Sequence, residues 1–242
     1  MEFFGLANYR YLTRRLVIDG ATFDNIRKQY LQYHIGKSFA DRVSLIEFGV
    51  QVPSALSKEY GPPLHVLYAG RGGIQKRVWL IDRIARPMLN QGLPLVFHFA
   101  GTMEADLSAD VQARSCMHGQ VSDKNELNRL YQQCHVLILT SAYEGFPLVV
   151  KESMAYGCIP VVTGLPGNRT HLVHGENALL IQAIDNEDQV VAQGIALLQS
   201  LIDRPDLVRQ LSRNAYQYAR DHFSKDHFLQ AYRLLLLSSI ET

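Results

Sequence analysis

From residue 64 onward, short apolar runs alternate with longer segments whose apolar residues recur at helical spacing. The runs have the length and branched side chains of buried strands, and they lie at 64–69, 95–100, 115–118, 135–140, 159–163 and 178–181. Helices are predicted at 75–91, 105–113, 126–133, 147–156, 188–202, 205–221 and 225–237. This alternation predicts an α/β fold built on a doubly wound parallel sheet of the Rossmann-like type.

The first 63 residues follow a different pattern. Apolar residues at helical spacing predict one helix over 22–39, and 41–50 has the character of a strand and turn. One helix and one strand cannot enclose a core of their own. Residues 51–63 are rich in Pro, Ser and Gly, which is typical of a linker. We therefore expect two regions, 1–63 and 64–242, of which only the second is a complete domain.

Composition and charge narrow the class of protein. With 242 residues, of which 47% are hydrophobic and 19% charged, the chain has the composition of a soluble globular protein. Its net charge of +1 argues against nucleic acid as a partner, because such proteins usually carry a basic face. Cys116, Cys134 and Cys158 lack CxxC spacing, so we interpret them as small buried hydrophobes in a reducing compartment.

Two segments have more than one interpretation. Residues 9–15 mix Arg with Tyr and Leu, which allows either peripheral contact with an anionic membrane or a solvated helix face. No apolar stretch approaches the ~20 residues of a membrane span, so we expect a cytoplasmic protein. His171 and His174 lie three residues apart, which allows either a metal site or ordinary packing in a turn. Without a third ligand, ordinary packing is the commoner role of such a pair.

A pair of carboxylates flanks the start of the helix predicted at 147–156. Glu144 and Glu152 lie eight positions apart within SAYEGFPLVVKESMAYG, residues 141–157. Pro147 is expected at the first helical position, where its missing N–H has no cost. The unit is therefore a strand, a tight turn and a helix. An isolated pair of this kind is more often solvated surface than a site.

The turn itself is a candidate anion site. Unpaired backbone N–H groups at a helix start point outward together with the positive end of the helix dipole. In this chain they belong to Gly145, Phe146 and the next residues, Pro147 having no N–H, so the candidate anion site spans Gly145 to Leu148.

A second candidate piece is the loop YAGRGGIQKR, residues 68–77, at the carboxyl end of the first predicted strand. Ligands of open parallel sheets collect at that edge. Gly70 and Gly72 allow close approach to the backbone, while Arg71 and Lys76 supply positive charge and donors for a diphosphate. The loop fits neither GxGxxG nor GxxxxGK[ST], so alone it is equally compatible with a surface turn.

The run EGFPLVVKESMAYGCIPVVT resembles the signature of retaining glycosyltransferases of the GT-B fold, in the group 1 or family 4 class. That signature has a Glu, seven residues, a second Glu, a Met-Ala-x-Gly turn and a Pro-Val-Val strand. The resemblance covers the chain from residue 64 to its end. It implies the C-terminal, nucleotide-sugar-binding half of a GT-B architecture, with 1–63 as a remnant of the N-terminal domain and a linker.

The resemblance also implies roles for individual residues. Arg71 and Lys76 hold the diphosphate of the donor, with Arg77 as the alternative to Lys76. Glu144 accepts hydrogen bonds from the donor sugar, and Glu152 binds the ribose hydroxyls. The segment at Gly119 lies near the base of the donor.

The function implied is transfer of a sugar from a UDP- or GDP-linked donor to a glycan, lipid-linked or other acceptor, with retention of configuration. No cofactor is expected, and the absence of an Asp-x-Asp motif predicts a reaction without metal. Since the family binds its acceptor mainly through the N-terminal domain, we expect inactivity without such a domain, which a partner chain would supply. The alternatives are a noncatalytic nucleotide-sugar-binding or assembly subunit and another GT-B activity, such as an epimerase or phosphorylase.

Overall fold

The structure is a computed structural model that describes residues 9–18 and 20–237. The chain divides into two compact units, one formed by 50–222 and the other by residues up to Gly49 together with those from Phe223 onward. The predicted division at residue 63 differs from these units in the placement of 50–63 and of the last helix. Each unit is described by itself.

The unit 50–222 contains a six-stranded sheet in which all the strands are parallel. Its strands are β3 (Leu64–Arg71), β4 (Leu95–Thr102), β5 (Cys116–Gly119), β6 (Val136–Leu139), β7 (Ile159–Thr163) and β8 (Leu179–Ile181). Their order is β5-β4-β3-β6-β7-β8, so the winding reverses between β3 and β6. The predicted fold class is confirmed, and this reversal is the switch point at which such sheets bind ligands.

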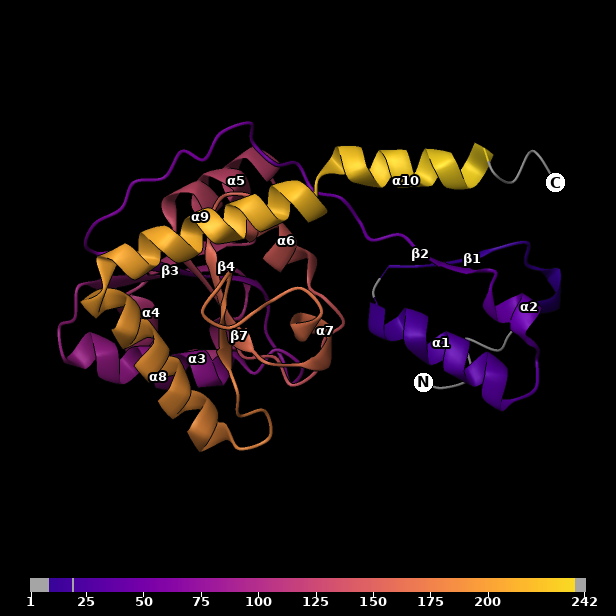
Figure 1. The fold of residues 1–242 in the computed structure, drawn as a ribbon. Coiled ribbons are helices and arrows are strands. Elements are labelled where there is room, and N and C mark those ends of the chain that lie inside the picture. Colours follow the sequence, from indigo (N-terminus) through magenta and orange to yellow (C-terminus); the bar gives the residue numbers. More distant parts are fainter. Residues whose placement is uncertain (1–8, 19, 238–242) are drawn as a thin grey trace. The chain divides into compact units, whose positions relative to one another are not determined.

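Helices cover both faces of this sheet (Figure 1). They are α3 (Val78–Asn90), α4 (Ala109–Ala113), α5 (Lys124–Gln133), α6 (Leu148–Met154), α7 (Pro166–Arg169), α8 (Glu187–Asp203) and α9 (Pro205–His222). α3 packs against α4 and α8, and α6 packs against α9. Every residue of β6 and β7 is buried, because a parallel sheet between two helical layers has no solvated face.

Several helix boundaries differ from the prediction. α3 begins at Val78 rather than at residue 75, because Arg77 has a left-handed backbone with φ 48°. Pro147 precedes α6 with φ −65° and ψ 133°, so it caps the helix instead of opening it. The helix predicted at 105–113 is divided into η3 (Glu104–Asp106) and α4, which the Ser108 hydroxyl caps by accepting the Val111 N–H.

The segment 50–63 contains no helix and takes part in no strand pairing beyond a single bridge residue, Val50. It is attached to the unit through side chains. The Lys58 amine donates to the carbonyl of Tyr131 at 2.9 Å and also contacts the carbonyl of Cys134. The Tyr216 hydroxyl donates to the Pro53 carbonyl at 2.8 Å. We call 50–63 the strap.

The other unit contains η2 (Tyr9–Tyr11), β1 (Arg15–Val17), α1 (Gly20–Gln32), α2 (Lys37–Ala40), β2 (Val43–Leu45) and α10 (Lys225–Leu237). β1 and β2 form a parallel pair. A small core packs beside them, made of Val17, Ile26, Tyr30, Ala40 and Val43. The single helix predicted over 22–39 is wrong, because His34 (φ 54°) and Gly36 (φ 109°) adopt left-handed backbone that ends α1.

Two smaller expectations also need correction. Residues 9–15 form one turn of 3-10 helix and the start of β1, so they do not present a helix face of either kind. Cys134 and Cys158 are buried as predicted, but Cys116 is exposed at the start of the edge strand β5. Within 9–18 and 20–237, no helix combines the length and apolar character needed to cross a membrane.

Candidate functional site

The two candidate pieces lie next to each other at the carboxyl edge of the sheet. β3 leads into the loop 72–77, and β6, its neighbour, leads into the loop 140–147. The Ala142 N–H donates to the Gln75 carbonyl at 2.8 Å. The Thr140 hydroxyl donates to the Arg77 carbonyl at 2.9 Å. We call the two loops together the switch-point site.

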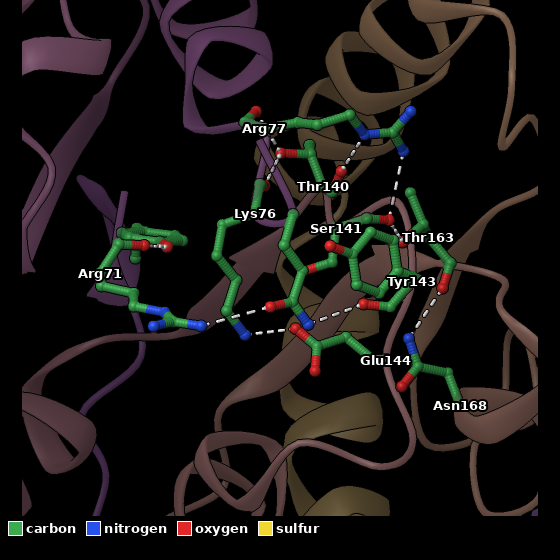
Figure 2. Close-up of polar contacts among 11 residues, drawn as sticks. Arg71, Lys76, Arg77, Thr140, Ser141, Tyr143, Glu144, Thr163 and Asn168 are labelled. Atoms are coloured by element: carbon green, nitrogen blue, oxygen red, sulfur yellow. Dashed lines mark hydrogen bonds and ion pairs between the residues drawn. The ribbon is translucent and has the colours of Figure 1, made fainter. Parts of the chain in front are cut away.

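Lys76 and Glu144 form an ion pair that joins the two loops. The Lys76 Nζ contacts the Glu144 Oε1, and Figure 2 shows the two side chains pointing toward each other. Their side chains are 17% and 12% exposed, so the pair is largely shielded from solvent while still reachable from it. Opposite charges in contact offset part of the cost of taking each of them out of water. The structure therefore brings together two residues that lie 68 positions apart in the sequence.

Arg71 is placed beside this pair by Gln75. The Arg71 Nη2 donates to Gln75 Oε1 at 3.5 Å, and Gln75 Nε2 donates to the Tyr143 carbonyl at 3.0 Å. Gln75 thereby links the loop that carries Arg71 to the loop that carries Glu144. Sequence analysis assigned no role to Gln75, because a neutral side chain in a loop carries no distinctive pattern.

Arg77, the alternative to Lys76, points elsewhere. Its guanidinium donates to the carbonyls of Thr140 at 2.8 Å, Ile184 at 2.7 Å and Ser141 at 3.2 Å. The residue is 7% exposed, and Figure 2 shows it turned away from Glu144. Of the two adjacent cations, only Lys76 contacts Glu144.

An acidic residue from the loop after β4 also lies against the glycine-rich loop. The Gly73 N–H donates to Asp106 Oδ2 at 2.9 Å, and a Cβ on Gly72 would lie 2.1 Å from the same oxygen. A side chain at position 72 would therefore displace the Asp106 carboxylate from the loop. Arg71, Gly72, Gly73 and Asp106 help to line a hollow of about 390 Å³. The sequence contained no signal for Asp106, since it lies far from the loop along the chain.

Tyr68, a residue of β3, fixes the position of the last residue of that strand. Its hydroxyl donates to the Arg71 carbonyl at 2.5 Å. Burial raises the pKa of Tyr68 well above its ordinary value, and the negative charges of Asp106 and Glu144 raise it further. The phenol therefore stays protonated and remains a donor at neutral pH. This contact fixes the backbone from which the Arg71 side chain extends.

The predicted turn residues 145–148 connect β6 to α6. A Cβ on Gly167 would lie 1.7 Å from the Gly145 carbonyl oxygen, so α7 packs directly on this turn. The Phe146 ring lies 4.6 Å from the His171 ring, with Lys151 Nζ 5.4 Å from its centroid. Leu148 begins α6 and is 47% exposed.

Glu152 and Gly119 lie apart from the ion pair. Glu152 Oε2 accepts a hydrogen bond from the Tyr131 hydroxyl at 3.1 Å. Over the described part of the chain, no hydrogen bond or ion pair joins Glu152 to Lys76 or Glu144. Gly119 ends β5, two strands from β3 at the same edge of the sheet, with φ 61°.

The remaining histidines of the sequence analysis have protein partners. His171 Nδ1 lies 3.1 Å from the Tyr218 hydroxyl, and His174 Nδ1 accepts the Leu180 N–H at 2.9 Å. Among residues 9–18 and 20–237, no group of three or more His, Cys, Asp or Glu side chains is arranged to hold a metal ion.

A larger hollow, of about 660 Å³, lies where the strap passes the amino-terminal ends of β3 and β6. His65 and His135 line it. His135 has both ring nitrogens engaged, Nδ1 by the His65 N–H at 3.0 Å and Nε2 with the Glu59 carbonyl at 3.0 Å. We place the site at the carboxyl edge instead, because the charged side chains converge there.

Comparison with known proteins adds independent information. A sequence profile of the family described as Glycosyl transferases group 1 matches residues 63–200. An uncharacterised glycosyltransferase of Haemophilus influenzae is 33% identical over 100 residues, covering 40% of this chain and 27% of that protein. The GtfA subunit of UDP-N-acetylglucosamine–peptide N-acetylglucosaminyltransferase from Streptococcus pneumoniae is 25% identical over 173 residues. That match covers 68% of this chain and 34% of GtfA, so the chain spans a minor part of both relatives.

Solved structures give the same fold. Pneumococcal O-GlcNAc transferase GtfA, in complex with UDP and GlcNAc, matches with a TM-score of 0.81 at 19% identity, covering 99% of this chain and 47% of that one. The GtfA/B complex matches with a TM-score of 0.78 at 18% identity, covering 99% and 48%. The C-terminal domain of a group 1 glycosyl transferase from Francisella tularensis matches with a TM-score of 0.57 at 20% identity, covering 68% and 88%.

Proposed function

The chain belongs to the group 1 glycosyl transferases, and from that premise we propose that it binds the donor of a retaining sugar transfer, a nucleoside-diphosphate sugar, without a divalent metal. The observation that carries the proposal is the convergence of Arg71, Lys76 and Glu144 on neighbouring loops at the switch point. Two cations and one carboxylate in that position suit a ligand with an anionic diphosphate and a hydroxyl-bearing sugar.

The charges suggest how the site would act on such a donor. When the bond between the sugar and the diphosphate breaks, negative charge grows on the leaving phosphate and positive character grows on the sugar ring. Arg71 and Lys76 would stabilise the leaving group through fixed positive charge, which acts strongly in a partly dry site. Glu144 would accept hydrogen bonds from the sugar hydroxyls. Because Glu144 already contacts Lys76, the two groups would be held in place before the donor arrives.

Glu152 would bind the other end of the donor. Its carboxylate suits the two vicinal hydroxyls of ribose, because one carboxylate can accept two such hydrogen bonds. Within the described residues Glu152 bonds to Tyr131 and not to the ion pair, which supports a division of labour between nucleoside and sugar. GtfA is described as a UDP-N-acetylglucosamine enzyme, and its structure holds UDP, so a UDP-linked donor is favoured over a GDP-linked one.

The acceptor would be bound with the help of a domain outside the unit 50–222. GtfA is described as a subunit and forms a complex with GtfB. This observation favours a second candidate function, in which the chain is a nucleotide-sugar-binding subunit that needs a partner chain for activity. Turnover by the chain alone, with any glycan or lipid-linked acceptor, would exclude that second function.

Calorimetric titration with UDP, GDP and their sugar conjugates tests the proposal. Glu152→Gln should weaken UDP and the UDP-sugar by similar factors, whereas Glu144→Gln should weaken only the sugar nucleotide. Loss of a hydrogen bond to a charged acceptor is worth roughly 1.5–3 kcal/mol, or about ten- to a hundredfold in affinity. Glu126→Gln, an exposed carboxylate in the first turn of α5, is the matched control and should change neither affinity.

Three outcomes would contradict the proposal. Failure of the wild-type chain to bind any nucleotide or nucleotide sugar would exclude a donor site. Loss of all nucleotide binding in the presence of EDTA would exclude donor binding without a divalent metal. Equal weakening of bare UDP by both Glu substitutions would exclude the division of labour while leaving the site in place.

A further inference from the structure

Glu152 has two carboxylate oxygens in different situations. Oε2 accepts the hydrogen bond from the Tyr131 hydroxyl at 3.1 Å. Oε1 has no hydrogen-bond partner among residues 9–18 and 20–237, and it is not one of the buried polar atoms without a partner. One oxygen is therefore committed to the protein, and the other is accessible to a ligand.

Tyr131 is held rigidly at both ends. Its ring is 1% exposed and packs 6.1 Å from the ring of Tyr156. Its backbone carbonyl accepts hydrogen bonds from Lys58 Nζ at 2.9 Å and from the Cys158 thiol at 3.0 Å. A buried ring on a fixed backbone has little freedom, so its hydroxyl marks one fixed point in space for the carboxylate.

Tyr131 can act only as a donor in this contact. An ionised carboxylate accepts hydrogen bonds and cannot donate them. Burial raises the pKa of Tyr131 well above its ordinary value, and the charge and hydrogen bond of Glu152 raise it further. The phenol therefore keeps its proton throughout the physiological range.

We propose that Tyr131 is a positioning residue for nucleoside recognition, holding Glu152 so that its free oxygen faces the ribose hydroxyls of the donor. This inference rests on the proposed function, in which Glu152 binds ribose. It adds a residue of α5, outside both loops of the switch-point site, to the machinery that selects a ribonucleoside. Without the Tyr131 hydroxyl, the carboxylate would have to be ordered by the ligand itself, which lowers affinity.

The test is calorimetric titration of the full chain with UDP and with 2′,3′-dideoxy-UDP. Tyr131→Phe should weaken UDP by about three- to tenfold, the scale of one hydrogen bond. The same variant should bind dideoxy-UDP with the affinity of the wild type, because that ligand has no 2′ or 3′ hydroxyl to donate a hydrogen bond to Glu152. Tyr156→Phe is the matched control, since Tyr156 lies beside Tyr131 but makes no hydroxyl hydrogen bond within 9–18 and 20–237.

A double-mutant cycle gives a second readout that a merely structural residue would not move. In the Glu152→Gln background, adding Tyr131→Phe should cost much less UDP affinity than it costs in the wild type. Equal losses for UDP and dideoxy-UDP, or full additivity in the cycle, would overturn the inference while leaving the proposed function intact. If Tyr131→Phe folds poorly, the ratio of its UDP affinity to its dideoxy-UDP affinity can still be compared with the same ratio in the wild type, because both ligands are measured on one sample. Failure of the wild type to bind UDP and GDP would overturn both.

Discussion

The switch-point site and a row of histidines are both built on the same sheet, yet they use polar side chains in opposite ways. At the site, Lys76 and Glu144 form an ion pair of opposite charges. In the row, His98 Nε2 lies 2.8 Å from His65 Nδ1, and His98 Nδ1 lies 3.1 Å from His118 Nε2. Burial lowers the pKa of His98 to about 4, and its two histidine neighbours act in the same direction.

The contrast shows what decides whether a buried polar group keeps its charge. In the row, each imidazole has another imidazole as its neighbour, so a proton gained by one would repel a proton on the next. A neutral His98 can donate from one ring nitrogen and accept at the other, which satisfies both of its histidine contacts. At the site, opposite charges offset their own desolvation. Fixed charge is therefore concentrated at the edge where an anionic ligand would arrive.

The largest effect should separate two arginines only six positions apart. Arg77→Met should lower the free energy of unfolding by at least about 3 kcal/mol, because three carbonyls, two of them in buried hydrogen bonds and one in a part-buried one, lose charged donors. Arg71→Met should change stability by less than about 0.5 kcal/mol, since its side chain is on the surface. Urea unfolding of both variants measures the difference. Equal destabilisation would show that Arg71 belongs to the scaffold rather than to the site.

The histidine row should make stability fall with acid. Because the folded pKa of His98, about 4, lies below its ordinary value of 6.5, its contribution is complete above about pH 6.5 and is lost as the pH falls toward 4. This histidine alone should cost about 2 kcal/mol of stability between pH 7 and pH 5. His98→Gln should flatten that pH dependence, as measured by urea unfolding at both pH values. An unchanged slope in the variant would contradict the lowered pKa of His98.

A smaller effect should appear at the link between the loops. Gln75→Ala removes the bonds to Arg71 and to the Tyr143 carbonyl, and should lower stability by about 0.5–1.5 kcal/mol. Amide hydrogen exchange should speed up in 140–147 while remaining unchanged in β7. Gln132→Ala, at an exposed position of α5, is the control. No change in exchange for Gln75→Ala would mean that the ion pair and the other hydrogen bonds between the loops hold them together without the Gln75 side chain.

Much of the fold could be predicted because its strands are mostly apolar. The run 159–163 reads as a strand in sequence, and all five residues of β7 are buried. The proximity of Arg71 to Glu144 also follows from the sequence, since Arg71 ends β3, Glu144 follows β6, and the two strands end at one edge. A sequence cannot separate Lys76 from Arg77, however. They are adjacent and have the same charge, and only the left-handed backbone of Arg77 turns it inward.

The contacts that support the site were not predictable for a different reason. Asp106, Gln75 and Tyr131 have ordinary neighbours in sequence, and their roles arise from contacts with distant segments. The exposure of Cys116 depends on β5 being an edge strand, which is a property of strand order. The break after α1 depends on the backbone of His34, a residue type compatible with a helix.

The strap has a practical consequence for anyone who wishes to isolate the sheet unit. A fragment cut immediately before Leu64 would lose Lys58, and with it the amine that contacts the carbonyls of Tyr131 and Cys134. It would also lose the acceptor of the Tyr216 hydroxyl on α9. A fragment that begins at Val50 keeps all of these hydrogen bonds, so the better boundary for a shortened protein lies before the strap. A fragment that contains the sheet must therefore include the strap, although the strap has no regular secondary structure.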